Sequence, residues 1–168
     1  VIKHAIVSRS PDLFEQIESG YWKLDAGELL PPLASLQNLV AQAIQIKINI
    51  IQEDPYEKGK RTVLNLGHTF AYAIEHASNH QVTHGEAVSI GLVAATDLSH
   101  RLGYCSSTLR ERIKDLLEYN GLPTKTPSGV SVGTLRDALN RDKKRRDGHL
   151  RFVLLRDIGD IFVTDDIR

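Results

Sequence analysis

One segment of the sequence, from Glu86 to about Leu102, carries apolar residues around nearly its whole circumference when it is drawn as a helix. A helix that is apolar on all sides lies in the middle of a domain rather than on its surface. The chain must therefore supply other elements that surround it, and His84 at its start is expected near the interior. The apolar residues are Ala87, Val88, Ile90, Leu92, Val93, Ala94, Ala95 and Leu98.

The ends of this central helix are marked by capping residues. Thr83 and Glu86 have the spacing of a capping box, in which each side chain bonds to the backbone N–H of the other residue. Gly103 stands where the helix should end. Glu86 has a second interpretation as a metal ligand, but the capping role is the one that the pattern favours.

Proline, glycine and asparagine divide the rest of the chain into further helices and a short strand pair. A helix capped by Ser10, with Pro11 at its first position, is predicted to run to about Gly20. Two β-rich runs on either side of Gly159 predict a hairpin. The other predicted helices span about 33–52, 63–77, 107–119 and 132–140, and the strands 151–155 and 160–163. We therefore predict one mainly α domain over residues 1–168, with a small β-hairpin near the C-terminus.

The beginning of the chain predicts that the sequence is a piece of a longer protein. It contains no methionine, and Val1 to Val7 reads as the middle of a helix without a capping residue ahead of it. We interpret this as an amino-terminal half that is missing, although a processed amino terminus is an alternative. The 168 residues are enough for one domain with its own core.

Composition excludes several classes of partner. Lys+Arg and Asp+Glu number 21 each, and the basic run 141–148 has no interleaved aromatic residues, which argues against nucleic acid. No apolar run approaches the ~20 residues that cross a bilayer. Cys105 is the single cysteine, which excludes an internal disulfide and fits a cytoplasmic location. We therefore expect no nucleic-acid and no membrane partner.

Lys47 lies within the apolar stripe of the predicted helix 33–52, among Val40, Ala43, Ile44 and Ile50. Its methylene groups could cover the edge of the core while the ammonium group reaches water. Alternatively, the cation points into a cleft and meets an anion. Periodicity alone favours the first interpretation.

A second unusual pattern is the polar face of the predicted helix 63–77. Asn65, His68, Tyr72 and Glu75 are spaced three, four and three residues apart, so they lie along one side of a helix. A solvated face is usually built from Lys and Glu, and this one is not. His68 and His84 lie sixteen positions apart on consecutive helices, where a tight turn would bring them together.

In one type of catalytic zinc site, two histidines and a carboxylate bind the ion, and its fourth coordination position stays open for water or substrate. The separation of His68 and His84 is not that of a short zinc motif, so spacing alone leaves the question open.

Residues 54–69 and His84-Gly85-Glu86-Ala87-Val88, with Ala73-Ile74-Glu75, Asp142-Lys143-Lys144 and Phe152-Val153-Leu154, resemble dehydroquinate synthase. The resemblance covers essentially the whole chain. It implies an α-helical carboxy-terminal domain that binds Zn2+ (or Co2+) and substrate. It also implies a separate amino-terminal domain that binds most of the NAD and is absent from this chain.

The resemblance assigns roles to individual residues. His68 and His84 match the two histidine ligands of the metal, and the third ligand, a glutamate, would fall immediately before Val1. Tyr72 stands where the family usually has a histidine that contacts substrate, and a phenol cannot carry a proton near neutral pH in the same way. The residues that match other positions of the active site are Lys3, Lys47, Glu57, Arg61, Asn65 and one of Lys143 and Lys144.

The activity implied is that of a phosphate lyase of the shikimate pathway. Such enzymes convert 3-deoxy-D-arabino-heptulosonate 7-phosphate to 3-dehydroquinate and phosphate, and they are homodimers; this chain alone is expected to be inactive. A related sugar-phosphate cyclase similar to 2-deoxy-scyllo-inosose synthase, and a non-catalytic interaction domain with the same fold, are the alternatives. A metal-dependent phosphohydrolase is less well supported, because no aspartate accompanies the histidines in a matching pattern.

Overall fold

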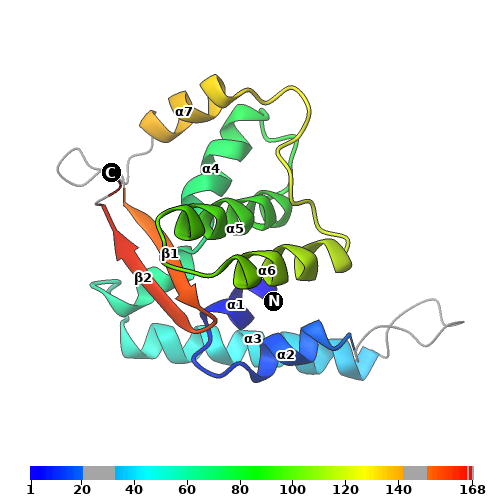
Figure 1. Ribbon diagram of the computed structural model, residues 1–168. Helices are drawn as coiled ribbons and strands as arrows, with labels where there is room; N and C mark the ends of the chain where they lie inside the picture. The colour runs from blue at the N-terminus through cyan, green and yellow to red at the C-terminus, as the bar shows by residue number, and fades with distance from the viewer. Residues whose placement is uncertain (21–32, 142–150, 166, 168) are drawn as a thin grey trace, which may run out of the picture. The chain divides into compact units, whose positions relative to one another are not determined.

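The computed structural model describes residues 1–20, 33–141, 151–165 and 167, which form two compact units (Figure 1). Unit 1 comprises Val1–Leu64 with Ile158–Asp160, and unit 2 comprises Asn65–Asp157 with Ile161–Arg168. The described part is mainly helical and ends in a two-stranded sheet, as predicted. No helix in it combines the length and the apolar character that a bilayer span requires.

The described residues of unit 1 form three α-helices, of which α1 contacts both of the others. They are α1 (Ile2–Val7), α2 (Asp12–Glu18) and α3 (Leu33–Glu53), followed by the 3-10 helix η1 (Lys60–Asn65). The predicted cap at Ser10 is displaced: α2 begins at Asp12 after Pro11, and Ser10 Oγ lies 3.4 Å from the Asp12 amide. The apolar face of α3 is only partly buried. Its buried members are Leu39 and Ala43, whereas Leu36, Val40 and Ile44 are exposed.

In unit 2 the central helix is α5 (His84–Arg101), which contacts α4 (His68–Ala77), α6 (Ser107–Tyr119) and β1 (Phe152–Asp157). Figure 1 shows α5 between α4 and α6. Its buried residues lie on several sides of the helix, which confirms the prediction of an internal helix. They are Ala87, Ser89, Ile90, Gly91, Leu92, Ala95, Thr96 and Ser99.

The crossing of α4 and α5 depends on two glycines. A Cβ placed on Gly91 would overlap the carbonyl oxygen of Gly67, and one on Gly67 would lie 2.9 Å from the amide nitrogen of Leu92. Gly67 also has φ +76°, a left-handed backbone conformation that residues other than glycine rarely adopt. The predicted continuous helix 63–77 is therefore wrong: η1 ends at Asn65, and α4 starts afresh at His68.

The hairpin of β1 and β2 (Asp160–Thr164) contributes residues 158–160 to unit 1 and the rest of its strands to unit 2, and each part makes contacts within its own unit. In unit 2, Ser99 Oγ accepts a hydrogen bond from the Leu155 amide at 3.2 Å and donates one to the Ala95 carbonyl at 2.8 Å. In unit 1, the amide of Gly159 donates to the Ile6 carbonyl at 2.8 Å. The remaining described helix, α7 (Val132–Arg141), packs on α4.

We expect Gly91→Ala to lower the free energy of unfolding by about 1–3 kcal/mol, because the added methyl group overpacks the backbone crossing. Gly85→Ala in the same helix is the matched control, since nothing lies within 4 Å of its Cβ position. It should be neutral or stabilising by up to about 1 kcal/mol. Urea unfolding monitored by circular dichroism measures both, and equal stabilities of the two variants would contradict the close crossing.

Candidate functional site

His84 is the first residue of α5, and a complete capping box holds the backbone there. The Thr83 hydroxyl accepts a hydrogen bond from the Glu86 amide at 3.5 Å, and Glu86 Oε2 accepts from the Thr83 amide at 2.9 Å. Hydrogen bonds from the side chain and backbone of Thr83 lower the pKa of Glu86 below its ordinary value. Glu86 therefore has the capping role that the sequence favoured.

The structure brings the rings of His68 and His84 together. Their centroids lie 5.4 Å apart, with the planes at 72°. A tetrahedral zinc ion bound at about 2.0–2.1 Å to one nitrogen of each ring would hold the centroids about 5 Å apart. The observed separation therefore fits two imidazoles on one metal ion.

Both rings have a hydrogen-bond acceptor at Nδ1. The Leu66 carbonyl lies 3.2 Å from Nδ1 of His68, and Oε1 of Glu75 lies 3.0 Å from Nδ1 of His84. Because a carbonyl and a carboxylate only accept, each Nδ1 carries the proton. Nε2 is then the nitrogen that would coordinate a metal in both rings.

In the part of the chain that the structure describes, these two histidines do not belong to a larger cluster of possible metal ligands. Within the described residues there is no group of three or more His, Cys, Asp or Glu side chains that could hold a metal ion. The third ligand implied by the resemblance is a glutamate ahead of Val1, which is not among these residues. The two histidines could thus supply two of the three protein ligands that a catalytic zinc site uses.

The polar face of α4 continues from His68 to Tyr72 and Glu75. The Tyr72 side chain is 40 % exposed, and its ring makes an edge contact with His68 at a centroid distance of 6.3 Å. Asn65, at the end of η1, is half-buried. These contacts explain the unusual composition of this face. His68 and Glu75 contact His84, and Tyr72 contacts His68.

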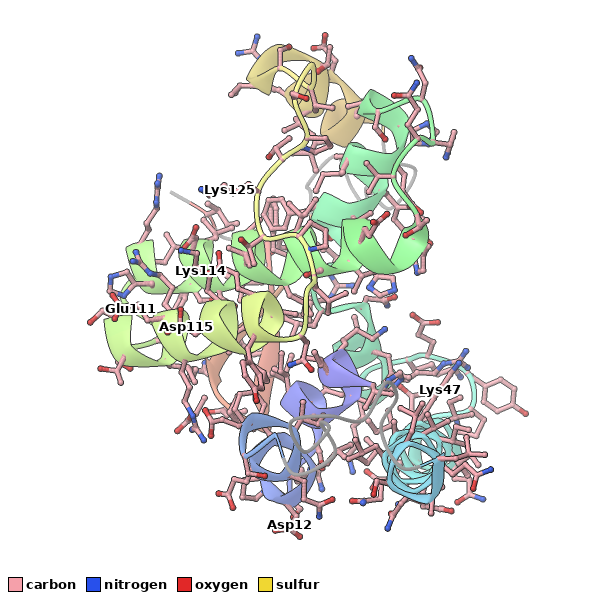
Figure 2. All side chains as sticks on the ribbon, turned by 90° about the vertical axis from the view of Figure 1, so that its right-hand side faces the viewer. Asp12, Lys47, Glu111, Lys114, Asp115 and Lys125 are labelled. Carbon is pink, nitrogen blue, oxygen red and sulfur yellow. The ribbon has the colours of Figure 1, made fainter. Side chains whose placement is uncertain are left out.

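In unit 1, two lysines come close enough for their charges to interact. Lys3 Nζ donates to the Leu64 carbonyl at 2.8 Å. Burial, and secondly the charge of Lys47, lower the pKa of Lys3 from 10.5 to about 8. Figure 2 shows Lys47 projecting from α3, where it is exposed. An anion bound beside these groups would offset the free energy of bringing two cations together.

The segment that runs from the end of α3 into η1 carries Glu57 and Arg61 and is organised by Asp54. The Asp54 carboxylate accepts hydrogen bonds from the amides of Lys58, Gly59 and Arg61 at 2.9, 2.8 and 3.0 Å. The bonds from Lys58 and Arg61 are the largest influences that lower the pKa of Asp54. Arg61 Nε lies 3.9 Å from the Glu57 carboxylate, so this segment holds the two side chains close together.

Each unit thus gathers some of the residues that the resemblance implied. Unit 1 has Lys3 near Lys47, and Glu57 near Arg61; unit 2 has His68 with His84 and Tyr72. Lys143 and Lys144 lie outside the described residues.

Two residues were missed as parts of the site, Glu75 and Asp54. Glu75 was visible in the polar stripe, two helical turns after His68. No sequence signal marked the acceptor role of Asp54.

Comparison with known proteins agrees with this geometry. The family model described as 3-dehydroquinate synthase C-terminal matches residues 1–145. The chain belongs to this family. A 3-dehydroquinate synthase of Nostoc punctiforme is 38 % identical over 168 residues, and one of Halorhodospira halophila is 40 % identical over 167. The alignments cover 99 % of this chain but 46 % of each relative, so the chain spans about half the length of these relatives.

Solved structures share the fold of this 3-dehydroquinate synthase C-terminal domain. The 2-epi-5-epi-valiolone synthase of Streptomyces hygroscopicus, with NAD+ and Zn2+ bound, matches with a TM-score of 0.80 at 25 % identity, over 99 % of this chain and 46 % of its own. A 2-deoxy-scyllo-inosose synthase complexed with carbaglucose-6-phosphate, NAD+ and Co2+ matches with a TM-score of 0.72 at 22 % identity, over 94 % and 47 %. The predicted dehydroquinate synthase-like fold is confirmed.

The lowered pKa of Lys3 predicts a pH dependence of stability. Between pH 8 and 10.5 the unfolded lysine binds a proton that the folded one has lost, so the free energy of unfolding rises with pH across this window. We expect Lys3→Met to remove this part of the rise. Lys47→Met should reduce it, because the pKa of Lys3 moves back toward its ordinary value.

Urea unfolding at several pH values, compared between wild type and both variants, measures the effect. If the free energy of unfolding changes with pH between 8 and 10.5 in the same way in the wild type and in Lys3→Met, the lowered pKa of Lys3 is contradicted.

Proposed function

We propose that this chain is the metal- and substrate-binding part of a 3-dehydroquinate synthase. In this proposal the complete gene product converts 3-deoxy-D-arabino-heptulosonate 7-phosphate to 3-dehydroquinate and phosphate. It works as a cytoplasmic homodimer with NAD, most of which is bound by residues outside this chain. The observation that carries the proposal is the 5.4 Å approach of the His68 and His84 rings, each with a hydrogen-bond acceptor at Nδ1.

His68 and His84 are proposed to hold a divalent metal, Zn2+ or Co2+, through Nε2. A metal bound there supplies Lewis-acid polarisation of the hydroxyl group that NAD oxidises and of the carbonyl group that results. The donor set fits, because neutral imidazole nitrogens suit zinc and cobalt. Membership of the 3-dehydroquinate synthase family and the Zn2+ of the valiolone synthase structure support this choice.

The cationic and amide side chains are proposed to bind the two anionic groups of the substrate. Arg61 offers a planar guanidinium suited to a carboxylate, and lysine ammonium groups suit phosphate as point charges. Such contacts would fix the sugar ring in one orientation and thereby favour elimination of phosphate. The proposed binding residues are Lys3, Lys47, Arg61, Asn65 and one of Lys143 and Lys144.

Two further side chains are proposed to contact the substrate. Glu57, held beside Arg61 in the segment that Asp54 organises, would orient that guanidinium and the group it binds. Tyr72 can donate or accept a hydrogen bond through its hydroxyl group, in the place where the family usually has a histidine.

The proposal is tested by His68→Ala in the complete gene product. We expect dehydroquinate formation to fall by more than the roughly 10–100-fold that loss of an outer-shell partner costs. Bound zinc, measured by inductively coupled plasma mass spectrometry, should fall as well. His76→Ala is the matched control, because His76 is an exposed histidine on the same helix that contacts the ring of His80.

Unchanged activity and zinc content in His68→Ala would contradict the metal assignment. Zinc binding without dehydroquinate formation by the wild type would contradict the reaction and favour the second candidate.

The second candidate is a sugar-phosphate cyclase that acts on a different sugar phosphate. Tyr72 favours it, because a phenol beside His68 differs from the usual histidine in proton affinity. The 25 % identity to a valiolone synthase is consistent with it. Offering the complete gene product a panel of sugar phosphates, with and without a carboxylate, separates the two. The presence of Arg61 favours the acidic substrate.

A further inference from the structure

We propose that Glu75 is a positioning residue that fixes the tautomer and the orientation of His84 for metal binding. This inference rests on the proposed function, because it assumes that His84 is a metal ligand. Glu75 has no role among the residues that the resemblance implied.

The contact itself is short, and its carboxylate is the more covered of the two partners. Oε1 of Glu75 lies 3.0 Å from Nδ1 of His84, and the Glu75 side chain is 14 % exposed whereas that of His84 is 58 % exposed. A covered carboxylate is costly unless it accepts hydrogen bonds. The pair therefore places a mostly covered acceptor beside a ring that is itself more exposed.

The two helices make this contact possible. Glu75 lies seven residues after His68, two turns along the same face of α4. The capping box of Thr83 and Glu86 fixes the backbone of His84 at the start of α5. With its backbone held by the cap and Nδ1 held by the carboxylate, the imidazole has little freedom left to rotate.

The chemistry of the acceptor determines which nitrogen is presented. A carboxylate cannot donate, so Nδ1 of His84 carries the proton and Nε2 has the lone pair. The Leu66 carbonyl imposes the same tautomer on His68. A histidine ligand that donates its other N–H to a carboxylate is also a more basic and better oriented ligand. Glu75 thus gives His84 the same tautomer as His68, with the proton on Nδ1.

A direct ligand role for Glu75 is the competing explanation, and the structure disfavours it. The Glu75 carboxylate is engaged by the ring of His84, and with the two histidines it does not form a group of three possible ligands within the described residues. Glu75→Gln distinguishes the positioning role from the ligand role, because glutamine keeps an acceptor oxygen but is a poor metal ligand.

The test measures zinc affinity of the complete gene product by competition with a chromogenic chelator. Glu75→Ala should weaken zinc binding by about 10–100-fold, and Glu75→Gln by less than about tenfold, because the amide oxygen still accepts from Nδ1. Glu111→Ala is the control, since Glu111 is an exposed carboxylate on α6, labelled in Figure 2. It should leave the affinity unchanged.

A second readout does not depend on the metal. Long-range 1H–15N correlation spectra of the zinc-free protein, with 15N-labelled histidine, report the tautomer of each neutral ring. We expect the Nδ1–H form of His84 in the wild type and in Glu75→Gln. In Glu75→Ala the Nε2–H form of His84 should become populated, while His68 keeps its Nδ1–H form. Thermal unfolding of each variant verifies that it is folded.

The outcomes separate the inference from the function on which it rests. If zinc affinity is unchanged in both His68→Ala and His84→Ala, the metal site itself is refuted. If those variants lose zinc while Glu75→Ala retains wild-type affinity and the wild-type tautomer, the positioning role is refuted. Equal losses in Glu75→Gln and Glu75→Ala, with an unchanged tautomer, would assign Glu75 as a ligand instead.

Discussion

The structure of unit 2 depends on the contact between the backbones of Gly67 and Gly91. Neither position has room for a methyl group, so the backbones of α4 and α5 are in close contact at this point. Gly67 directly precedes His68, and Gly91 lies seven residues after His84 on the same helix as that histidine. The crossing therefore fixes where α4 starts relative to α5, and with it the distance between the two imidazole rings.

Hydrogen bonds then convert this proximity into a site with defined chemistry. With acceptors at both Nδ1 atoms, Nε2 of each ring is the nitrogen that would bind a cation. A similar logic holds in unit 1, where the Asp54 carboxylate collects three backbone amides and thereby shapes the segment of Glu57 and Arg61. In both units, residues without a proposed contact to metal or substrate organise side chains that are proposed to bind one of them.

Much of this arrangement could be predicted from the sequence, and the reasons are local. The capping box at Thr83 and the glycine at 103 placed α5 within one residue at each end, because these signals act within one helical turn. The break at Gly67 was missed, since periodicity alone cannot distinguish an αL glycine from a tolerated helical one. The contact between Glu75 and His84 was missed because it depends on how α4 packs against α5. Residue spacing within one helix does not predict that packing.

The proposed metal site requires that two imidazoles from neighbouring helices bind one divalent cation. Zinc K-edge X-ray absorption spectroscopy of the complete gene product, loaded with one equivalent of zinc, identifies the ligands of the metal. We expect two imidazole nitrogen ligands at about 2.0–2.1 Å and the loss of one of them in His84→Gln. A zinc environment without histidine, or one that His84→Gln leaves unchanged, would contradict the proposed site.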